Sequence, residues 1–449
     1  MPIRAALRPM SLLRACAVAA CLTLPAGPAL LAADAPAAAP LKVLRYAFRV
    51  AETGFDPAQI SDLYSRTIAA NIFDAPLQLE FLARPVRARP NTAAAMPEVS
   101  ADFKTFTFTI QPGIYFSDDP AFKGQKRELV AADYVYSIKR HYDPKHKSPN
   151  LFSFENDKLL GLSELRQELI KAGKPFDYDR YRFQVKLAES NPRFVEDMTD
   201  GSVVGAVARE VVEAYGDKIM DHPVGTGPFK LGEWRRLSRI VLERNPGYRE
   251  VYYDETAPAD NPVAQAAAAK LKGRRLPMID RVEIGIIEEN QPRWLSFLNK
   301  EYDLVEEVPA EFADRVMPGD QLAPNLKRNG IQMVRYARAD VALSLFNLED
   351  PMVGGYTPEK VALRRAISLA VDLDKEIRLV RKRQAMPAQG PIGPGTWGYD
   401  PAFRSEMSEF NLARAKALLD LYGYVDKDGD GWRDQPDGSP LVQIGRAHV

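Results

Sequence analysis

Strand-like and helical repeats alternate along this chain, and this alternation restricts its fold more than any other feature. Residues Thr105–Ile110 place every second, apolar side chain on one face, which is typical of a half-buried strand. Residues Thr357–Arg383 follow a helical repeat instead, with Pro358 at the first helical position. A chain that mixes both repeats predicts an α/β fold. Further strands are expected at Lys42–Val50, Tyr181–Leu187, Arg239–Glu243 and Val282–Ile287, and further helices at Val130–Arg140 and Asn411–Tyr422.

Length and charge restrict the class of protein further. The chain has 449 residues, which at about 100–200 residues per domain indicates two to four domains. Lysine and arginine together number 60, and so do aspartate and glutamate. A nucleic-acid-binding protein would carry a basic excess on at least one domain, so the balanced charge argues against a nucleic-acid partner.

Cysteine and histidine are scarce where catalysis or metal binding would need them. Cys16 and Cys21 lie near the N-terminus, and the rest of the chain has no cysteine. Thiol nucleophiles, cysteine-ligated zinc and iron–sulfur clusters are therefore excluded from the body of the protein. None of the four histidines is spaced as in the helical zinc motif H-E-x-x-H. We expect no cofactor, and the scarcity of histidine disfavours an enzyme.

Residues 1–33 are expected to be a secretory signal peptide. Three arginines and no acidic residue begin the chain, the apolar stretch Ala15–Leu31 follows, and small residues end it. The stretch is too short and too rich in proline to cross a membrane comfortably, since a span takes about 20 apolar residues. Cleavage is expected near Ala33, or else at Ala35, and residues 34–40 are expected to be an Ala/Pro tether.

Cys21 has a second interpretation, as the lipidated cysteine of a lipoprotein signal. Lipidation requires an apolar region of about 7–15 residues before the cysteine. Only Ala15–Ala20 separate Arg14 from Cys21, so the length argues against lipidation but leaves the question open.

Several local motifs allow both an ordinary and a functional interpretation. Pro223–Phe229 contains two glycines that permit close backbone approach, so it is either a tight turn between strands or a rigid corner beside a ligand cleft. Met386–Tyr399 holds three prolines and four glycines, and such a long loop is usually functional or disordered. The pairs Glu288–Glu289 and Glu306–Glu307 could serve a hydrolase as paired carboxylates, but surface charge is the simpler interpretation.

An acidic turn resembles the start of a calcium-binding loop. Asp426, Asp428 and Asp430 alternate and Gly431 follows, so three carboxylates could supply oxygen ligands. The last ligand position would fall on Asp437, where a longer, bidentate glutamate is expected. A solvated hairpin turn without metal is the favoured interpretation of this segment.

Four stretches share a combination of motifs with one protein family. They are Ile114–His141, Val224–Tyr248, Leu363–Asp374 and Ala413–Pro440. In these stretches the chain resembles the family-5 extracellular solute-binding proteins, the oligopeptide- and dipeptide-binding components of bacterial ABC importers. Arg249 departs from the family pattern, in which a tryptophan usually follows the tyrosine.

The resemblance implies an α/β fold like that of the type II periplasmic binding proteins, with two hinged lobes, mixed sheets and a subdomain inserted in lobe one. We expect the lobe-one core in residues 41–71 and 201–287, the inserted subdomain in residues 72–200, and an incomplete lobe two in residues 288–443. Residues 444–449 are expected to be a non-native tail, because a glycine and two basic residues break the alternation that begins at Leu441. On this interpretation the sequence is a gene fragment.

The resemblance also implies a function. The protein would be periplasmic, would capture peptides in the cleft between its lobes and would deliver them to an inner-membrane permease with its ATPase. It would act as a monomer and catalyse no reaction. Two alternatives stay open: a receptor for a non-peptide solute such as haem, a metal chelate or an oligosaccharide, and a secreted hydrolase.

The expected cleft residues are aromatic side chains and one asparagine, chosen by position alone. Aromatic rings offer contact area at a low entropic cost, and asparagine pairs with amides. Ordinary core or surface packing is an open alternative for each of them. The residues are Tyr46 and Phe48 on the first expected strand, Phe346 and Asn347 at the end of an apolar strand of lobe two, and Trp397 and Tyr399 in the Pro/Gly loop.

Overall fold

The computed structural model describes residues 40–161, 181–405 and 408–442. The expected signal peptide, residues 34–39 of the expected tether and the expected tail at 444–449 lie outside the described residues. In the part of the chain that is described, no helix is both long enough and apolar enough to cross a membrane.

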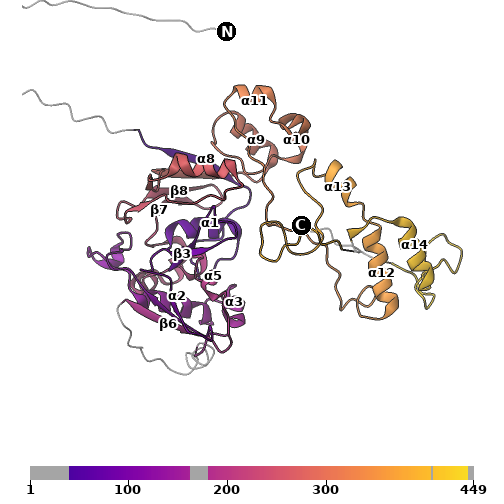
Figure 1. The fold of residues 1–449 in the computed structure, drawn as a ribbon, viewed down its shortest axis with the longest axis horizontal. Helices are drawn as coiled ribbons and strands as arrows, with labels where there is room; N and C mark the ends of the chain where they lie inside the picture. The colour runs from indigo at the N-terminus through magenta and orange to yellow at the C-terminus, as the bar shows by residue number, and fades with distance from the viewer. Residues whose placement is uncertain (1–39, 162–180, 406–407, 443–449) are drawn as a thin grey trace, which may run out of the picture. The chain divides into compact units, whose positions relative to one another are not determined.

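A four-stranded mixed sheet brings one strand from near the start of the described chain together with three strands from residues 229–286 (Figure 1). Strands β1 (Val43–Phe48) and β11 (Arg281–Ile286) are parallel neighbours, whereas β8 (Arg239–Arg244) runs antiparallel to both of its neighbours. The register places Tyr46, Ile284 and Ile240 side by side across the sheet. The mixed sheet expected from the resemblance is therefore confirmed. Its strands, in spatial order, are β1 (Val43–Phe48), β11 (Arg281–Ile286), β8 (Arg239–Arg244) and β7 (Phe229–Arg235).

Helix α1 (Leu63–Ile72) packs against one face of this sheet (Figure 1). Asp62 caps the helix, because its carboxylate accepts a hydrogen bond from the backbone N–H of Ser65 at 2.8 Å. The apolar side of the helix then meets the apolar face of the sheet, and removal of this surface from water stabilises the core. The buried residues of the contact are Phe48, Ile68, Ala69, Ile72, Ile240, Leu242 and Ile284.

The Pro223–Phe229 motif passes close to the end of α1. The backbone N–H of Gly227 donates to the carbonyl oxygen of Ile72 at 2.9 Å. A Cβ on Gly227 would lie 2.7 Å from that oxygen, and a Cβ on Gly225 would collide with it. Close backbone approach, rather than a positive φ, therefore requires both glycines.

Residues of the expected inserted subdomain form a separate three-stranded sheet, and the apolar core around it extends beyond the expected boundary at 200 to Val224. Its antiparallel strands are β4 (Glu98–Val99), β5 (Thr105–Thr109) and β6 (Arg182–Lys186), with β5 in the middle. The rings of Phe108 and Phe183 stack across β5 and β6 with centroids 4.9 Å apart. Tyr134 of α2 (Ala131–Tyr142) lies over Phe183, with ring centroids 5.6 Å apart. The two clean alternations in the sequence are thus confirmed as neighbouring strands.

The C-terminal half differs from two sequence expectations. The helix predicted over Thr357–Arg383 is divided into α12 (Pro358–Leu369) and α13 (Leu373–Leu379), because Asp372 caps a second helix through the backbone N–H of Lys375. The strand predicted to end at Phe346 is absent, since residues 331–349 pair with no described strand. A strand needs such a partner for its backbone hydrogen bonds.

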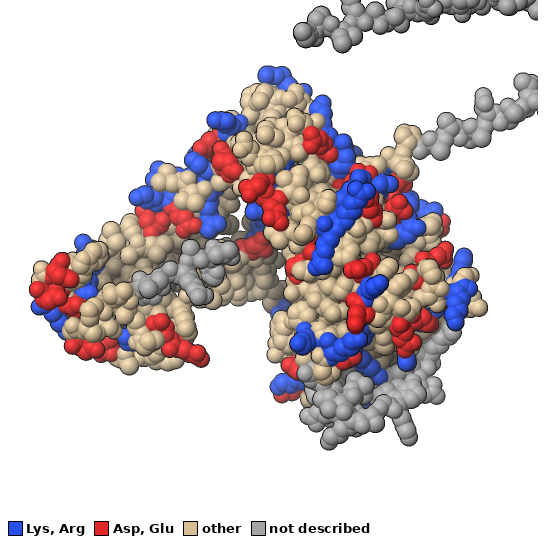
Figure 2. All heavy atoms as spheres, turned by 180° about the vertical axis from the view of Figure 1, so that it is seen from behind, with Lys and Arg blue, Asp and Glu red and all other residues tan. Residues whose placement is uncertain are grey.

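Small apolar cores hold the helices of the C-terminal half. One core surrounds Trp294 and Val316, and another joins α12 to α14 (Leu412–Leu421) around Leu363 and Tyr424. On the face shown in Figure 2, basic and acidic side chains are interspersed.

The remaining elements are short. They are β2 (Leu77–Leu79), β3 (Ala88–Pro90), η1 (Pro120–Phe122), α3 (Leu151–Asn156), α5 (Phe194–Asp197), α6 (Gly201–Val204), α7 (Arg209–Tyr215), η2 (Gly216–Asp221), β9 (Val251–Tyr252), α8 (Pro262–Leu271), β10 (Arg275–Leu276), α9 (Asn290–Leu298), α10 (Ala310–Val316), η3 (Pro318–Asp320) and α11 (Pro324–Arg328).

Candidate functional site

The carboxyl ends of β1 and β11 meet at one edge of the four-stranded sheet. The two strands are parallel, and just beyond them the backbone N–H of Ile287 donates to the carbonyl oxygen of Phe48 at 3.0 Å. In open α/β sheets, ligands bind outside the carboxyl ends of parallel strands. The side chains at this edge are therefore the first candidates for a ligand-binding site.

Three aromatic rings gather at this edge. The rings of Tyr46 and Phe48 meet edge to face with centroids 5.4 Å apart, and those of Phe48 and Tyr64 lie 4.5 Å apart. Phe48 is 1% exposed, so its ring belongs to the core beneath α1 and supports the other two. Tyr46 and Tyr64 are only half-buried. Of the two residues predicted on this strand, Tyr46 keeps a surface that a ligand could meet, whereas Phe48 is corrected to a core residue.

Residues 303–307, which we call the returning segment, run along the free edge of β1. Leu304 forms a parallel bridge with Tyr46. The carboxylate of Asp303 accepts hydrogen bonds from the backbone N–H of Arg45 at 2.8 Å and from its guanidinium at 2.7 and 3.1 Å. The backbone N–H of Asp303 donates in turn to the carbonyl oxygen of Arg45 at 2.9 Å. These links fix the returning segment beside the aromatic rings.

The two glutamates of the returning segment have different partners. Glu307 accepts a hydrogen bond from the guanidinium of Arg49, and the guanidinium of Arg338 lies 3.6 Å from it. Glu306 accepts a hydrogen bond from the hydroxyl of Tyr46. Burial, and then this hydrogen bond, raise the pKa of Tyr46, so the hydroxyl stays a donor at neutral pH. Both glutamates are exposed, as the surface-charge interpretation expects, and the contact with Tyr46 makes Glu306 an additional candidate site residue.

Glu52 is buried in the loop that follows β1. It is 3% exposed; its Oε1 accepts a hydrogen bond from the indole N–H of Trp234, and its Oε2 has no hydrogen-bond partner among the described residues. The ring of Trp234 also meets that of Phe55, with centroids 4.8 Å apart. Sequence reasoning missed Glu52, although an acidic residue shortly after a strand was an available signal.

The predicted cleft residues of the C-terminal half lie outside regular strands. Phe346 is half-buried and packs against the core between α12 and α14. Asn347 is exposed, and its side-chain oxygen accepts a hydrogen bond from the backbone two residues on, at 3.1 Å. Trp397 is 76% exposed and Tyr399 is 38% exposed. No hydrogen bond or ring contact within the described ranges joins these four residues to the edge of β1, so their place in one site stays a prediction.

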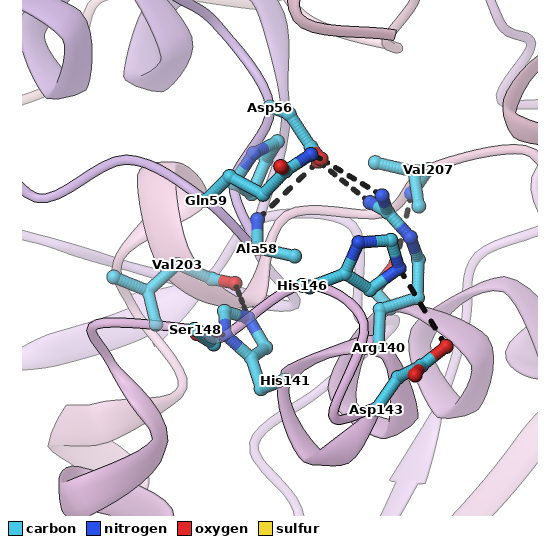
Figure 3. Close-up of polar contacts among 12 residues, drawn as sticks. Asp56, Ala58, Gln59, Arg140, His141, Asp143, His146, Ser148, Val203 and Val207 are labelled. Atoms are coloured by element: carbon cyan, nitrogen blue, oxygen red, sulfur yellow. Dashed lines mark hydrogen bonds and ion pairs between the residues drawn. The ribbon is translucent and has the colours of Figure 1, made fainter. Parts of the chain in front are cut away.

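A second polar cluster is buried where the loop after β1 meets α2 (Figure 3). The guanidinium of Arg140 donates to the two carboxylate oxygens of Asp56 at 2.6 and 2.8 Å. Burial alone would raise the pKa of Asp56, but the hydrogen bonds and charge of Arg140 hold it below its ordinary value. The next residue on the helix, His141, lies between the hydroxyl of Ser148 at 2.8 Å and the carbonyl oxygen of Val203 at 2.9 Å. The two terminal nitrogens of Arg140 are paired with Asp56, whereas its Nε has no hydrogen-bond partner among the described residues, and the ion pair fastens α2 to the loop.

The carboxylates of the acidic turn lie close together, and they accept hydrogen bonds from backbone N–H groups. Oxygen atoms of Asp426, Asp428 and Asp434 lie within 4.8 Å of one another. Asp426 accepts two backbone N–H groups of the turn at 2.7 and 2.9 Å, and Asp434 accepts one at 2.9 Å. Asp430 and Asp437, the other residues of the expected calcium loop, each accept from the backbone two residues on. The hairpin interpretation and the calcium interpretation of this turn both stay predictions.

Comparison with known proteins identifies relatives of the chain. Residues 87–445 match the family described as bacterial extracellular solute-binding proteins, family 5 Middle. The Di/tripeptide-binding protein 2 of Pseudomonas aeruginosa is 27% identical over 398 residues, which are 86% of this chain and 65% of that protein. The chain therefore spans less than two thirds of the length of this relative.

Solved structures share the fold. The ABC transporter-associated periplasmic binding protein DppA from Helicobacter pylori, in complex with the peptide STSA, has a TM-score of 0.63 at 21% identity, over 85% of this chain and 66% of that one. MoaA from A. tumefaciens R10, in complex with mannopinic acid, has a TM-score of 0.59 at 17% identity, over 86% of this chain and 66% of that one. Because the family match covers most of its length, this chain belongs to the family-5 bacterial extracellular solute-binding proteins, and its mixed α/β fold is theirs.

Proposed function

We propose that this protein is the peptide-binding component of a bacterial ABC importer. The observation that carries the proposal is the family match over residues 87–445, supported by a relative named for di- and tripeptides. The family consists of binding proteins rather than enzymes. The protein would accordingly hold its ligand and release it unchanged.

In this proposal the carboxyl edge of β1 forms one wall of the ligand cleft. The half-buried ring of Tyr46 offers contact area, and the exposed rings of Trp397 and Tyr399 offer more from the Pro/Gly loop. The exposed amide of Asn347 can pair with the main chain of a peptide. Main-chain pairing would let the receptor accept many side chains.

Secretion and delivery belong to the same proposal. Residues 1–33 would direct the chain to the periplasm. There a monomeric receptor would present the bound peptide to an inner-membrane permease with its ATPase. Neither step needs a cofactor.

One observation favours a second candidate, a receptor for a non-peptide solute. The fold that this chain shares with MoaA holds mannopinic acid in that protein. A sugar-derived acid is thus the alternative ligand class to test beside peptides.

Thermal unfolding with defined ligand sets separates the two candidates. A mixture of di- and tripeptides should raise the melting temperature, because a ligand that binds only the folded state stabilises it by about 2.7 kcal/mol at 100 times its Kd. Free amino acids in the same proportions are the control and should have no such effect. A shift with mannopinic acid but none with peptides would overturn the peptide proposal. Steady release of free amino acids from the peptides would instead indicate a hydrolase.

A further inference from the structure

The acidic residues of the returning segment are not all neutralised. Asp303 and Glu307 are each paired with an arginine of β1 or of the loop that follows it. Glu306 forms no ion pair with any residue that the structure describes; the hydroxyl of Tyr46 is its partner there. The segment therefore presents one exposed carboxylate whose charge no neighbouring cation balances.

The surroundings of this carboxylate suit a cation. Tyr46 holds Glu306 through its hydroxyl, and the rings of Tyr46, Phe48 and Tyr64 follow one another with centroids 5.4 and 4.5 Å apart. Ammonium and guanidinium groups bind carboxylates through charge-assisted hydrogen bonds. They are also attracted to the faces of aromatic rings. A fixed carboxylate beside half-buried tyrosines supplies both interactions at once.

Among the arginines near this site, Arg338 lies close enough for its charge to act on the hydroxyl of Tyr46. Arg338 is itself paired with Asp340 at 2.5 Å, which balances its charge, and it also lies 3.6 Å from Glu307, the partner of Arg49. It does not occupy the carboxylate of Glu306.

We propose that Glu306 and Tyr46 form a subsite for a cationic side chain of the ligand, the ammonium of lysine or the guanidinium of arginine. The inference rests on the proposed function, since it names the class of peptide that the site favours. Glu306 accepts the charge-assisted hydrogen bonds, while Tyr46 orients Glu306 and packs against the alkyl part of the ligand side chain. The protein then prefers basic peptides to neutral peptides of the same shape.

Calorimetry with trialanine peptides tests the subsite directly. Each position is replaced in turn by lysine or by norleucine, whose side chain lacks only the ammonium group. At one position the wild-type protein should bind the lysine peptide about tenfold more tightly, as expected for one hydrogen bond to a charged group. Glu306→Gln should remove that preference and leave the norleucine affinity unchanged. Tyr46→Phe, which keeps the ring but not the hydroxyl, should reduce the preference in part.

A matched control lies on the same stretch of chain. Glu301 is exposed and has no ion pair among the residues described, so Glu301→Gln should leave both affinities unchanged. Circular dichroism melts show whether each variant is folded. A lysine preference that survives Glu306→Gln, or an equal loss for both peptides, overturns the subsite without touching peptide capture.

The outcome in which no peptide binds is also decisive. If the wild-type protein binds none of the trialanine series, the proposed function fails. The subsite is then tested with Nα-acetyl-lysinamide, whose side-chain ammonium is free. The measurement is the broadening of the nuclear magnetic resonance lines of this probe when the protein is added. Broadening that Glu306→Gln abolishes supports the subsite, and no broadening with the wild-type protein overturns it.

Discussion

Replacing Arg140 with methionine should lower the free energy of unfolding by about 3–5 kcal/mol, the usual cost of removing one partner of a buried ion pair. The Asp56 side chain has no exposed surface, and that of Arg140 is 4% exposed. Without the guanidinium, the hydrogen bonds left to the carboxylate of Asp56 within the described part of the chain come from the side chain of Gln59 at 2.6 Å and the N–H of Ala58 at 3.3 Å. Two neutral donors cannot balance a buried charge.

Urea titration followed by far-ultraviolet circular dichroism measures this loss. The double variant Asp56→Asn/Arg140→Met should recover most of it, because neither charge then stays buried. The two single variants and the double variant form a double-mutant cycle that isolates the energy of the pair.

The pH dependence separates a lost ion pair from a general packing defect. In the wild-type protein the pKa of Asp56 is held low, so this group stabilises the fold above its unfolded pKa of about 3.9 and less as the pH falls below it. In Arg140→Met, burial raises the pKa of Asp56, so the penalty grows as the pH rises above about 3.9. The difference between wild type and variant should therefore shrink between pH 7 and pH 4. An equal difference at both pH values, or one below about 1 kcal/mol at pH 7, would refute the reasoning.

Three further predictions concern other parts of the chain. Burial lowers the pKa of His141 to about 4 from an ordinary 6.5, so protonation opposes folding. The stability that neutral His141 contributes is complete above pH 6.5, and about 3 kcal/mol of it is lost as the pH falls to about 4. Urea titrations at several pH values should therefore show that the free energy of unfolding falls less steeply with pH in His141→Gln than in the wild type. Gly225→Ala should lower the melting temperature by several degrees, since its Cβ collides with the carbonyl of Ile72, whereas Gly247→Ala, which meets only ordinary packing at 3.4 Å, should not. Calcium should bind the acidic turn no more tightly than about 10⁻⁴ M, because Asp437 bonds Ser439 instead of joining the group; tighter binding by calorimetry would contradict this.

Local repeats predicted the stretches that pair as strands in the structure, but they could not show which stretch would find no partner. The alternation at Thr105–Ile110 and at Tyr181–Leu187 became two paired strands, because each supplies the other's hydrogen bonds and packs its rings. Residues 331–349 have the same kind of pattern but pair with no described strand, and the pattern alone cannot show this. The break in the helix predicted from Thr357 falls at Asp372, whose side chain caps the second helix, and a helical repeat that continues across the break does not reveal it.

The candidate site depends on contacts that sequence spacing does not contain. Tyr46 and Phe48 share one face of a strand, so alternation could not distinguish the ring at the surface from the ring in the core. Glu306 reaches the site only because Asp303 pairs with Arg45 from 258 positions away. The acidic character of the returning segment was visible in the sequence, but which of its carboxylates lacks a cation was not.

Arg249 stands where the family usually has a tryptophan. Its contacts indicate that this difference concerns the stability of the protein rather than its choice of ligand. The guanidinium of Arg249 donates to the carboxylate of Asp74 at 2.7 Å, and the hydroxyl of Thr226, in the Pro223–Phe229 motif, donates to the same carboxylate at 2.9 Å. Both charged side chains are largely buried. A tryptophan carries a single N–H and no charge, so it would leave Asp74 buried without a cation. Arginine and aspartate therefore form one unit that ties the glycine motif to its neighbours, and this departure from the family concerns stability. Under the proposed function, we expect selectivity for ligands to depend instead on exposed groups at the carboxyl edge of β1, such as Glu306.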